Sequence, residues 1–387
     1  MVGYPQLAPE QRERFLNILD RYNQRELNNN RGGALRKLFD HTVARGGRLR
    51  SPLVVIMDLT NKCNQNCIFC YREGQKGLGG READWLFRSL EDLETIFEDL
   101  KAMNVASVAL TGGEATCHPR FLDALALAKS FGFATTLVTN GTAFREGQVR
   151  ALSAILDPAC DRVELSLDAA EPLAYGKIRQ AGRFNRLLTT LKEFRDYEIP
   201  FSTMTLLVRD NAAQALDILH LACEHNPRAM ALEPPFPKAH IEDPGIYARP
   251  EEVLTAYEAV LDCPRLADRT VTFNFLHFSI MAGVYHDVQQ ALGITEESLA
   301  GCHAGHASCT IDIRGDVHLC QYLISAGTSH VGNISRSPLS GLWAVAQEAR
   351  GAAASGCSRG CLAFTLDRRS CATGGELSAA AGGGAES

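Results

Sequence analysis

The sequence predicts an α/β fold, a partial (βα)6 TIM-like barrel with a small cysteine-rich C-terminal domain. Two observations predict it. From Leu53 onward, short β-rich runs alternate with longer amphipathic stretches, and after about residue 300 this alternation stops and cysteines gather. Alternating strands and helices indicate a parallel sheet with helices packed outside it. The alternation by itself leaves a doubly wound open sheet as the alternative.

The β-rich runs mark six strands, and the stretches between them have the period of a helix. Apolar residues recur at i, i+3 and i+4 in Trp85–Met103, Leu187–Tyr197 and Ala212–Glu224. Helical spacing also occurs near the N-terminus. The strand runs are 53–60, 105–111, 134–139, 162–167, 202–208 and 229–233, and the N-terminal helical runs are 10–25 and 34–44.

These patterns divide the chain into four parts. Residues 1–50 are predicted to be an N-terminal helical extension, and residues 51–300 the barrel. Residues 301–376 are predicted to form the cysteine-rich domain. The final segment, 377–387, is rich in Ala and Gly and is predicted to be a disordered tail.

Composition narrows the function classes. The 387-residue chain has a formal charge of -6 and 45% hydrophobic residues, as in a soluble globular protein. We expect no nucleic-acid partner, because the charge is mildly acidic, and no membrane partner, because no apolar run approaches roughly 20 residues. The N-terminus lacks a signal-peptide pattern, so we expect a cytoplasmic protein. In that reducing compartment, the 13 cysteines favour metal binding over disulfides.

The most informative motif is the trio Cys63, Cys67 and Cys70. Three thiolates on one short loop can hold three irons of a four-iron cluster, which leaves the fourth iron open. A cluster that serves only for electron transfer usually has four thiolate ligands. The alternative is a zinc knuckle completed by a distant residue, but zinc sites usually use paired C-x2–4-C units.

Further polar motifs follow the second, third and fourth predicted strands. They are Gly112-Gly113-Glu114, Asn140 and Ser166. Because the carboxyl ends of parallel strands meet at one edge of a sheet, we expect these residues to lie near the cysteine loop. Glycines let the backbone approach a ligand closely, and Glu114 can hold a ligand ammonium group. Asn140 is a candidate ligand contact or, alternatively, only part of an Asn-Gly turn.

Together these motifs resemble those of the radical S-adenosylmethionine (SAM) enzymes. The resemblance implies that a [4Fe-4S] cluster on the three cysteines reduces SAM to a 5′-deoxyadenosyl radical, with electrons from a donor such as flavodoxin or ferredoxin. It implies that Gly112, Gly113 and Glu114 bind the SAM amino group. As in the peptide-modifying branch, Ser166 and Arg179 would clasp the SAM carboxylate. A helix cap and a surface arginine are the alternative for these two residues.

A second group of cysteines lies near the C-terminus. A Gly-x4-Cys pattern from Gly315 to Cys320 resembles the hairpin of a SPASM or twitch domain, which implies an auxiliary cluster. We interpret the group as one auxiliary [4Fe-4S] cluster; a second cluster with a missing ligand and a structural zinc site are the alternatives. The candidate ligands are Cys302, Cys309, Cys320, Cys357, Cys361 and Cys371.

The resemblance predicts an enzyme that abstracts a hydrogen atom from a peptide (RiPP-type) or small natural-product precursor and so oxidises, cross-links or epimerises it. One alternative is a dehydrogenase or transferase acting on an aminocyclitol, nucleoside or amino acid, because residues 1–50 are too few for a leader-binding domain. An iron–sulfur electron carrier is the alternative of another class. Glu233 and Gln321 are candidate substrate contacts, although glutamine cannot act as a base, which argues against formylglycine formation.

Overall fold

The fold is described by a computed structural model of the chain. The residues that the structure describes are 5–28, 49–70, 86–87, 89–180, 182–235, 244–275, 278–279, 282, 284, 287, 304–324 and 329–354. The predicted helix at 34–44, the predicted tail, and Cys302, Cys357, Cys361 and Cys371 lie outside these residues. None of the helices in the described ranges is long and apolar enough to cross a membrane.

Ten strands of the described residues form one sheet, in the order β10-β9-β8-β1-β2-β3-β4-β5-β6-β7. Strands β1 to β7 run parallel in sequence order, and β8 pairs parallel with the other side of β1. Strands β9 and β10 continue the sheet in antiparallel fashion. Their bounds are β1 (Val54–Thr60), β2 (Ser107–Gly112), β3 (Ala134–Thr139), β4 (Arg162–Ser166), β5 (Phe201–Leu206), β6 (Met230–Glu233), β7 (Val271–Phe273), β8 (Ser308–Ile311), β9 (Asp316–His318) and β10 (His330–Asn333).

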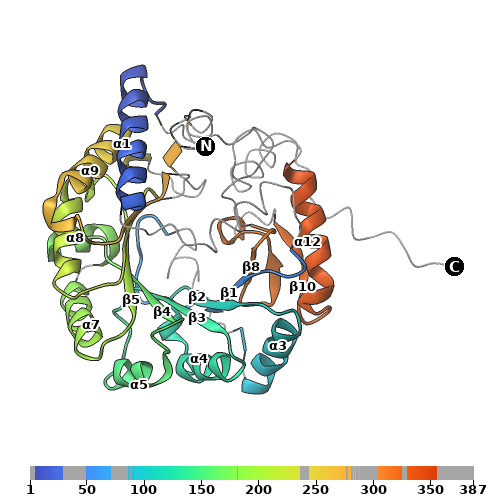
Figure 1. Ribbon diagram of the computed structural model, residues 1–387. Coiled ribbons are helices and arrows are strands. Elements are labelled where there is room, and N and C mark those ends of the chain that lie inside the picture. Colours follow the sequence, from blue (N-terminus) through green and yellow to red (C-terminus); the bar gives the residue numbers. More distant parts are fainter. Residues whose placement is uncertain are drawn as a thin grey trace.

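This topology confirms the partial barrel. A doubly wound sheet reverses its strand order part-way, whereas β1 to β7 never reverse. Helices lie around the outside of the curved sheet (Figure 1). Their bounds are α1 (Pro9–Asn28), α3 (Leu90–Ala102), α4 (Phe121–Ser130), α5 (Gln148–Ile155), α6 (Pro172–Tyr175), α7 (Phe184–Asp196), α8 (Ala215–Cys223), α9 (Pro250–Asp262) and α12 (Leu339–Ala354).

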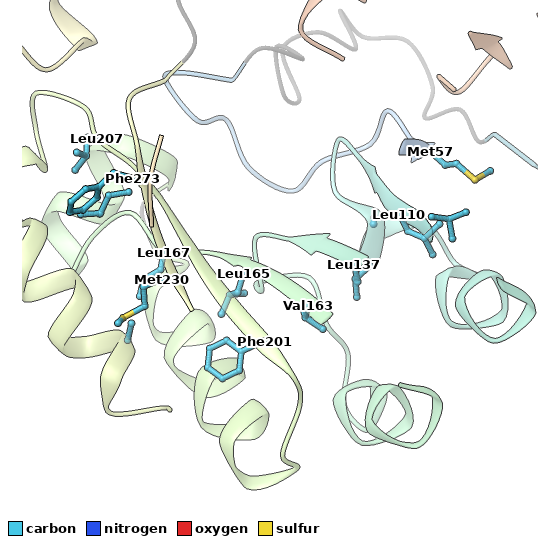
Figure 2. Packing of buried hydrophobic residues seen from close by; sticks show 14 of the residues in the cluster. Met57, Leu110, Leu137, Val163, Leu165, Leu167, Phe201, Leu207, Met230 and Phe273 are labelled. Carbon is cyan, nitrogen blue, oxygen red and sulfur yellow. The ribbon is translucent and has the colours of Figure 1, made fainter. Parts of the chain in front are cut away.

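Alternation along the strands separates an apolar outer face from a more polar inner face. Leu110, Leu137 and Val163 are fully buried and lie on the side of the sheet where the helices pack (Figure 2). The residues that alternate with these three along their own strands are for the most part partly exposed, and they point to the concave side. The helices therefore bury one face of the sheet, and the other remains available to form a site.

All six predicted strands are observed, with ends shifted by no more than two residues. The helix predicted at Trp85–Met103 begins later than expected, at Leu90, because Ser89 caps it: its Oγ accepts a hydrogen bond from the Asp92 backbone N–H at 3.2 Å. Strands β7 and β8 were not foreseen. Since β8 pairs with β1, the sheet extends across the predicted domain boundary at residue 300.

Candidate functional site

The loop after β1 carries Cys63, Cys67 and Cys70 as free thiols. The loop is tied down by two backbone bonds, from Cys70 N–H to the Cys67 carbonyl at 3.2 Å and from Ile68 N–H to the Ile178 carbonyl at 3.0 Å. Burial raises the pKa of Cys63 strongly, and the negative charge of Glu114 raises it further.

The same forces act on Cys67. Burial raises its pKa to about 11; Arg179 opposes this effect, and the neighbouring Cys70 adds to it. Buried thiolates that repel one another are stabilised by cationic iron, because a metal ligated by thiolates holds them deprotonated. The donor set therefore fits a cluster held by three cysteines.

The glycines of the Gly-Gly-Glu motif let the end of β2 lie against this loop. Gly112 has φ +129°, and a Cβ on Gly113 would stand 2.6 Å from the carbonyl oxygens of both Asn61 and Lys62. Two backbone hydrogen bonds form at this close approach. Gly113 N–H donates to the Thr60 carbonyl at 2.7 Å, and Glu114 N–H donates to the Lys62 carbonyl at 2.8 Å. No larger side chain fits at Gly113 without moving the loop.

The Glu114 carboxylate is buried and organises the strand ends around it. Its Oε1 accepts hydrogen bonds from the Thr116 N–H and hydroxyl and from the Thr139 hydroxyl. Its Oε2 accepts from the Asn140 N–H at 2.7 Å. A carboxylate oxygen has room for more than one donor, so Oε2 keeps acceptor capacity for a ligand ammonium group.

Asn140 joins the third strand end to the cysteine loop. Its Nδ2 donates to Asn64 Oδ1 at 2.9 Å and lies 4.0 Å from Cys63 Sγ. Its Oδ1 accepts the backbone N–H and the hydroxyl of Thr142, each at 2.8 Å. The amide thus bonds to the loop at one end and to its own turn at the other.

Gln65 was not singled out from the sequence, because a lone glutamine in a polar loop carries no recognisable pattern. It is fully buried. Its Nε2 donates to the Thr142 hydroxyl at 3.0 Å and to the Tyr175 hydroxyl at 2.7 Å. Its Oε1 accepts from Arg179 Nη1 at 3.2 Å. Gln65 therefore links the cysteine loop to the turn after β3 and to the segment after β4.

Ser166 and Arg179 are the predicted SAM-carboxylate pair, and Arg179 belongs to this network through Gln65. Ser166 ends β4 on the inner face, because its neighbour Leu165 is buried on the outer face. Arg179 lies in a π-helical turn (Gly176–Gln180, η3), and its Nε donates to Asp168 Oδ2. Arg179 is thus a buried residue and not a surface arginine.

An apolar patch covers the loop beside Cys67. Phe69, Ile178 and Val208 form a buried cluster against which Cys67 packs. The patch excludes water from one side of the loop. Exclusion of solvent is one of the factors that set the potential of an iron–sulfur centre.

Two carboxyl groups point to the inner face of the barrel. Burial raises the pKa of Glu164, against the lowering effect of Arg162. Burial also raises the pKa of Glu233; a hydrogen bond from Asn274 Nδ2 at 3.2 Å opposes this, and the charge of Glu164 adds to it. Glu164 was not foreseen, because inward orientation is a property of the folded sheet.

Of the six predicted auxiliary ligands, the described residues include two. Cys309 lies in β8 in register with Val55, whose side chain faces the outer core. Burial raises the pKa of Cys309 to about 12. Cys320 lies after β9, at the start of a 3-10 turn (Gln321–Leu323, η7) that contains the candidate Gln321. Cys309 is therefore part of the packed core, whereas Cys320 is half-buried and packs against that core.

The comparisons with known proteins agree with this geometry. The Radical SAM superfamily model matches residues 57–222, the segment that carries the cysteine loop, the Gly-Gly-Glu motif and the Arg179 turn. Residues 57–222 of this chain are a radical SAM domain.

Curated relatives match this chain at low identity. A probable GTP 3′,8-cyclase of Thermococcus kodakarensis is 27% identical over 169 residues, which cover 43% of this chain and 52% of that protein. The mycofactocin maturase MftC of Mycobacterium ulcerans is 25% identical over 283 residues, which cover 71% of this chain and 70% of MftC. The chain spans about half the length of the first curated relatives it matches.

A solved structure with the same fold is SuiB of Streptococcus suis. Bound to S-adenosylmethionine, SuiB superposes with a TM-score of 0.62 at 17% identity, over 76% of this chain and 65% of SuiB. Bound to its precursor peptide SuiA, it gives a TM-score of 0.63 over 78% of this chain and 67% of SuiB. The chain therefore shares the overall fold of SuiB.

Proposed function

We propose that this enzyme holds a [4Fe-4S] cluster on Cys63, Cys67 and Cys70 and removes a hydrogen atom from a peptide (RiPP-type) or small natural-product precursor. One observation carries the proposal: the three-cysteine loop is hydrogen-bonded to the segments that follow β2, β3 and β4. When bound, the cluster and SAM supply a one-electron cleavage that yields methionine and a 5′-deoxyadenosyl radical, which takes the substrate hydrogen.

The chain's own groups orient SAM. In this proposal Glu114 Oε2 accepts a hydrogen bond from the SAM amino group, which its spare acceptor capacity at the end of β2 supports. Ser166 and Arg179 Nη2 donate to the SAM carboxylate. Asn140 keeps the loop in place through Asn64.

The substrate lies on the inner face of the barrel in this proposal. Glu164 and Glu233 contact it there, because both carboxyls point inward and both have raised pKa values. A peptide is the leading substrate class, since SuiB is bound to its precursor peptide and covers most of this chain. A small molecule is the second candidate, because a probable GTP 3′,8-cyclase also matches. Oxidation, cross-linking and epimerisation are the outcomes that fit.

We assign one auxiliary cluster to Cys320 together with ligands among Cys302, Cys357, Cys361 and Cys371. Cys309 is assigned to the core, because its side chain shares the outer face of the sheet with Val55. An external donor such as a flavodoxin or ferredoxin supplies the electrons.

Formation of 5′-deoxyadenosine tests the central proposal. Protein reconstituted anaerobically with iron and sulfide, and given dithionite and SAM, should release 5′-deoxyadenosine. Cys67→Ala should abolish the product, while Cys160→Ala, at an exposed thiol, should retain it. A well-loaded protein that releases none would favour an electron carrier.

A second assay separates the two substrate classes. Short peptides encoded beside the gene for this chain would be added to the loaded enzyme in one arm and nucleosides or aminocyclitols in the other. The compounds of the correct substrate class should increase the formation of 5′-deoxyadenosine, and their own mass should change. Stimulation by small molecules alone would reject the peptide substrate.

A further inference from the structure

A buried cation lies against one sulfur of the cysteine loop. Arg179 Nη1 is 3.6 Å from Cys67 Sγ, a distance that allows an N–H···S hydrogen bond. Arg179 is only 7% exposed. Its guanidinium carbon is also 5.5 Å from the centroid of the Phe69 ring.

Two hydrogen bonds fix the orientation of the guanidinium. Asp168 accepts from Nε, and the other oxygen of Asp168 is held by the Leu206 N–H at 2.7 Å. Gln65 Oε1 accepts from Nη1. Because the guanidinium is planar, bonds at Nε and Nη1 fix the whole group. Nη1 therefore faces Cys67 as a consequence of the fold.

The positive charge stays on Arg179 despite its burial. An arginine stays protonated in proteins, and the buried ion pair with Asp168 compensates the guanidinium for its loss of solvent. A charged donor beside a ligand sulfur draws electron density away from it. Hydrogen bonds to ligand sulfurs are among the factors that set the reduction potential of an iron–sulfur cluster.

We propose that Arg179 is a positioning residue that raises the reduction potential of the SAM-binding cluster through its Nη1–H···Sγ bond to Cys67, with Asp168 and Gln65 holding it in place. This role rests on the proposed cluster site and is separate from SAM binding. Among the described residues Nη2 has no hydrogen-bond partner, so one guanidinium can serve the sulfur and the SAM carboxylate at once.

The test measures the cluster's midpoint potential by EPR-monitored redox titration without SAM. The EPR signal that is lost in Cys67→Ala protein is assigned to the SAM-binding cluster. Arg179→Met should shift its potential to more negative values, because charge and donor are both lost. Lys177→Met removes an exposed cation from the same turn and should leave the potential unchanged.

Two further variants keep the test decisive. Arg179→Met leaves the Asp168 charge buried without its partner, which destabilises proteins strongly. Asp168→Asn/Arg179→Met removes both charges, and Arg179→Lys keeps the cation without the planar fork; each should also shift the potential to more negative values. If neither Met variant takes up iron, Arg179→Lys decides.

Unchanged potentials, with weaker SAM binding by equilibrium dialysis, would overturn the inference and leave Arg179 as a carboxylate ligand. Failure of the wild-type loop to load any cluster would instead reject the proposed function.

Discussion

At the scale of single residues, close approach and burial hold the cysteine loop against the strand ends. Gly113 is fixed by the carbonyls of Asn61 and Lys62, which would meet its Cβ at 2.6 Å. Glu114 is buried among donors from two strand ends. These contacts hold the cysteine loop in shape, so that its buried thiols are in position before iron binds.

Gly113→Ala should disrupt the loop. The new methyl group meets backbone on both sides, so relief requires a shift of the loop; we expect a loss of stability of about 1–3 kcal/mol and poor iron loading, measured by iron analysis and thermal unfolding. Gly341→Ala in α12 is the matched control, since its Cβ meets nothing within 4 Å. It should stabilise by about 0.5–1 kcal/mol. Equal loading of both variants would contradict the close-approach argument.

His118 predicts a pH dependence of stability. It stacks on Phe87 with ring centroids 4.4 Å apart, and burial lowers its pKa from 6.5 to about 4. As the pH falls below 6.5, His118 takes up a proton in the unfolded chain before it does so in the folded protein, which lowers the free energy of unfolding. The contribution of the buried neutral ring to that free energy is therefore complete above pH 6.5 and is lost as the pH falls toward 4. Denaturant unfolding across this range should show a weaker pH slope for His118→Asn, which retains an acceptor for the Arg120 N–H. Parallel slopes for the two proteins would reject this role.

At the scale of elements, the chain closes the far edge of the sheet with its own N-terminal helix. Helix α1 packs on α9 and on the residues that follow β7. There the Phe15 ring lies against the rings of Phe275 and Phe278, at centroid distances of 5.9 and 5.1 Å. Arg14 of α1 pairs with Glu251 and Glu258 of α9. Apolar packing therefore lies beneath a rim of ion pairs.

Phe15→Ala should destabilise the enzyme far more than Arg14→Met. Phe15 is fully buried, and its loss leaves a cavity that costs about 3–5 kcal/mol. The Arg14 pairs are partly exposed to solvent, which screens them to about 1 kcal/mol or less. Urea unfolding of the two variants measures both values; a larger loss for Arg14→Met would show that ion pairs dominate this docking.

At the scale of the whole molecule, one sheet carries both predicted cluster regions. β1 leads into the SAM-cluster loop, and its parallel neighbour β8 leads through β9 to Cys320. The two regions are thus attached to adjoining strands, although about two-thirds of the chain separates them in sequence. The three-cysteine loop and Cys320 are thus attached to the same sheet.

Iron content tests the number of clusters. Two four-iron clusters require about eight irons per chain. Cys67→Ala and Cys320→Ala should each lower this by about four, whereas Cys309→Ala should not. Iron analysis with protein quantified by amino-acid analysis decides the matter. A wild-type value near twelve would replace the single auxiliary cluster with two, and loss of iron in Cys309→Ala would return that residue to the ligands.

The sequence by itself determined the six strands, their parallel pairing and the motifs at their ends, because strand and helix periods and glycine spacing are local properties. The order of the strands, which separates a partial barrel from a doubly wound sheet, came only from the folded sheet. Only the tertiary structure decided that β8 joins β1, that Glu164 faces inward, and that Gln65 and Asp168 fix Arg179 against Cys67. Those features depend on register and on contacts between residues far apart in the chain, such as the 112 positions between Cys67 and Arg179. No local pattern encodes them, since packing of the whole sheet sets which side chains meet.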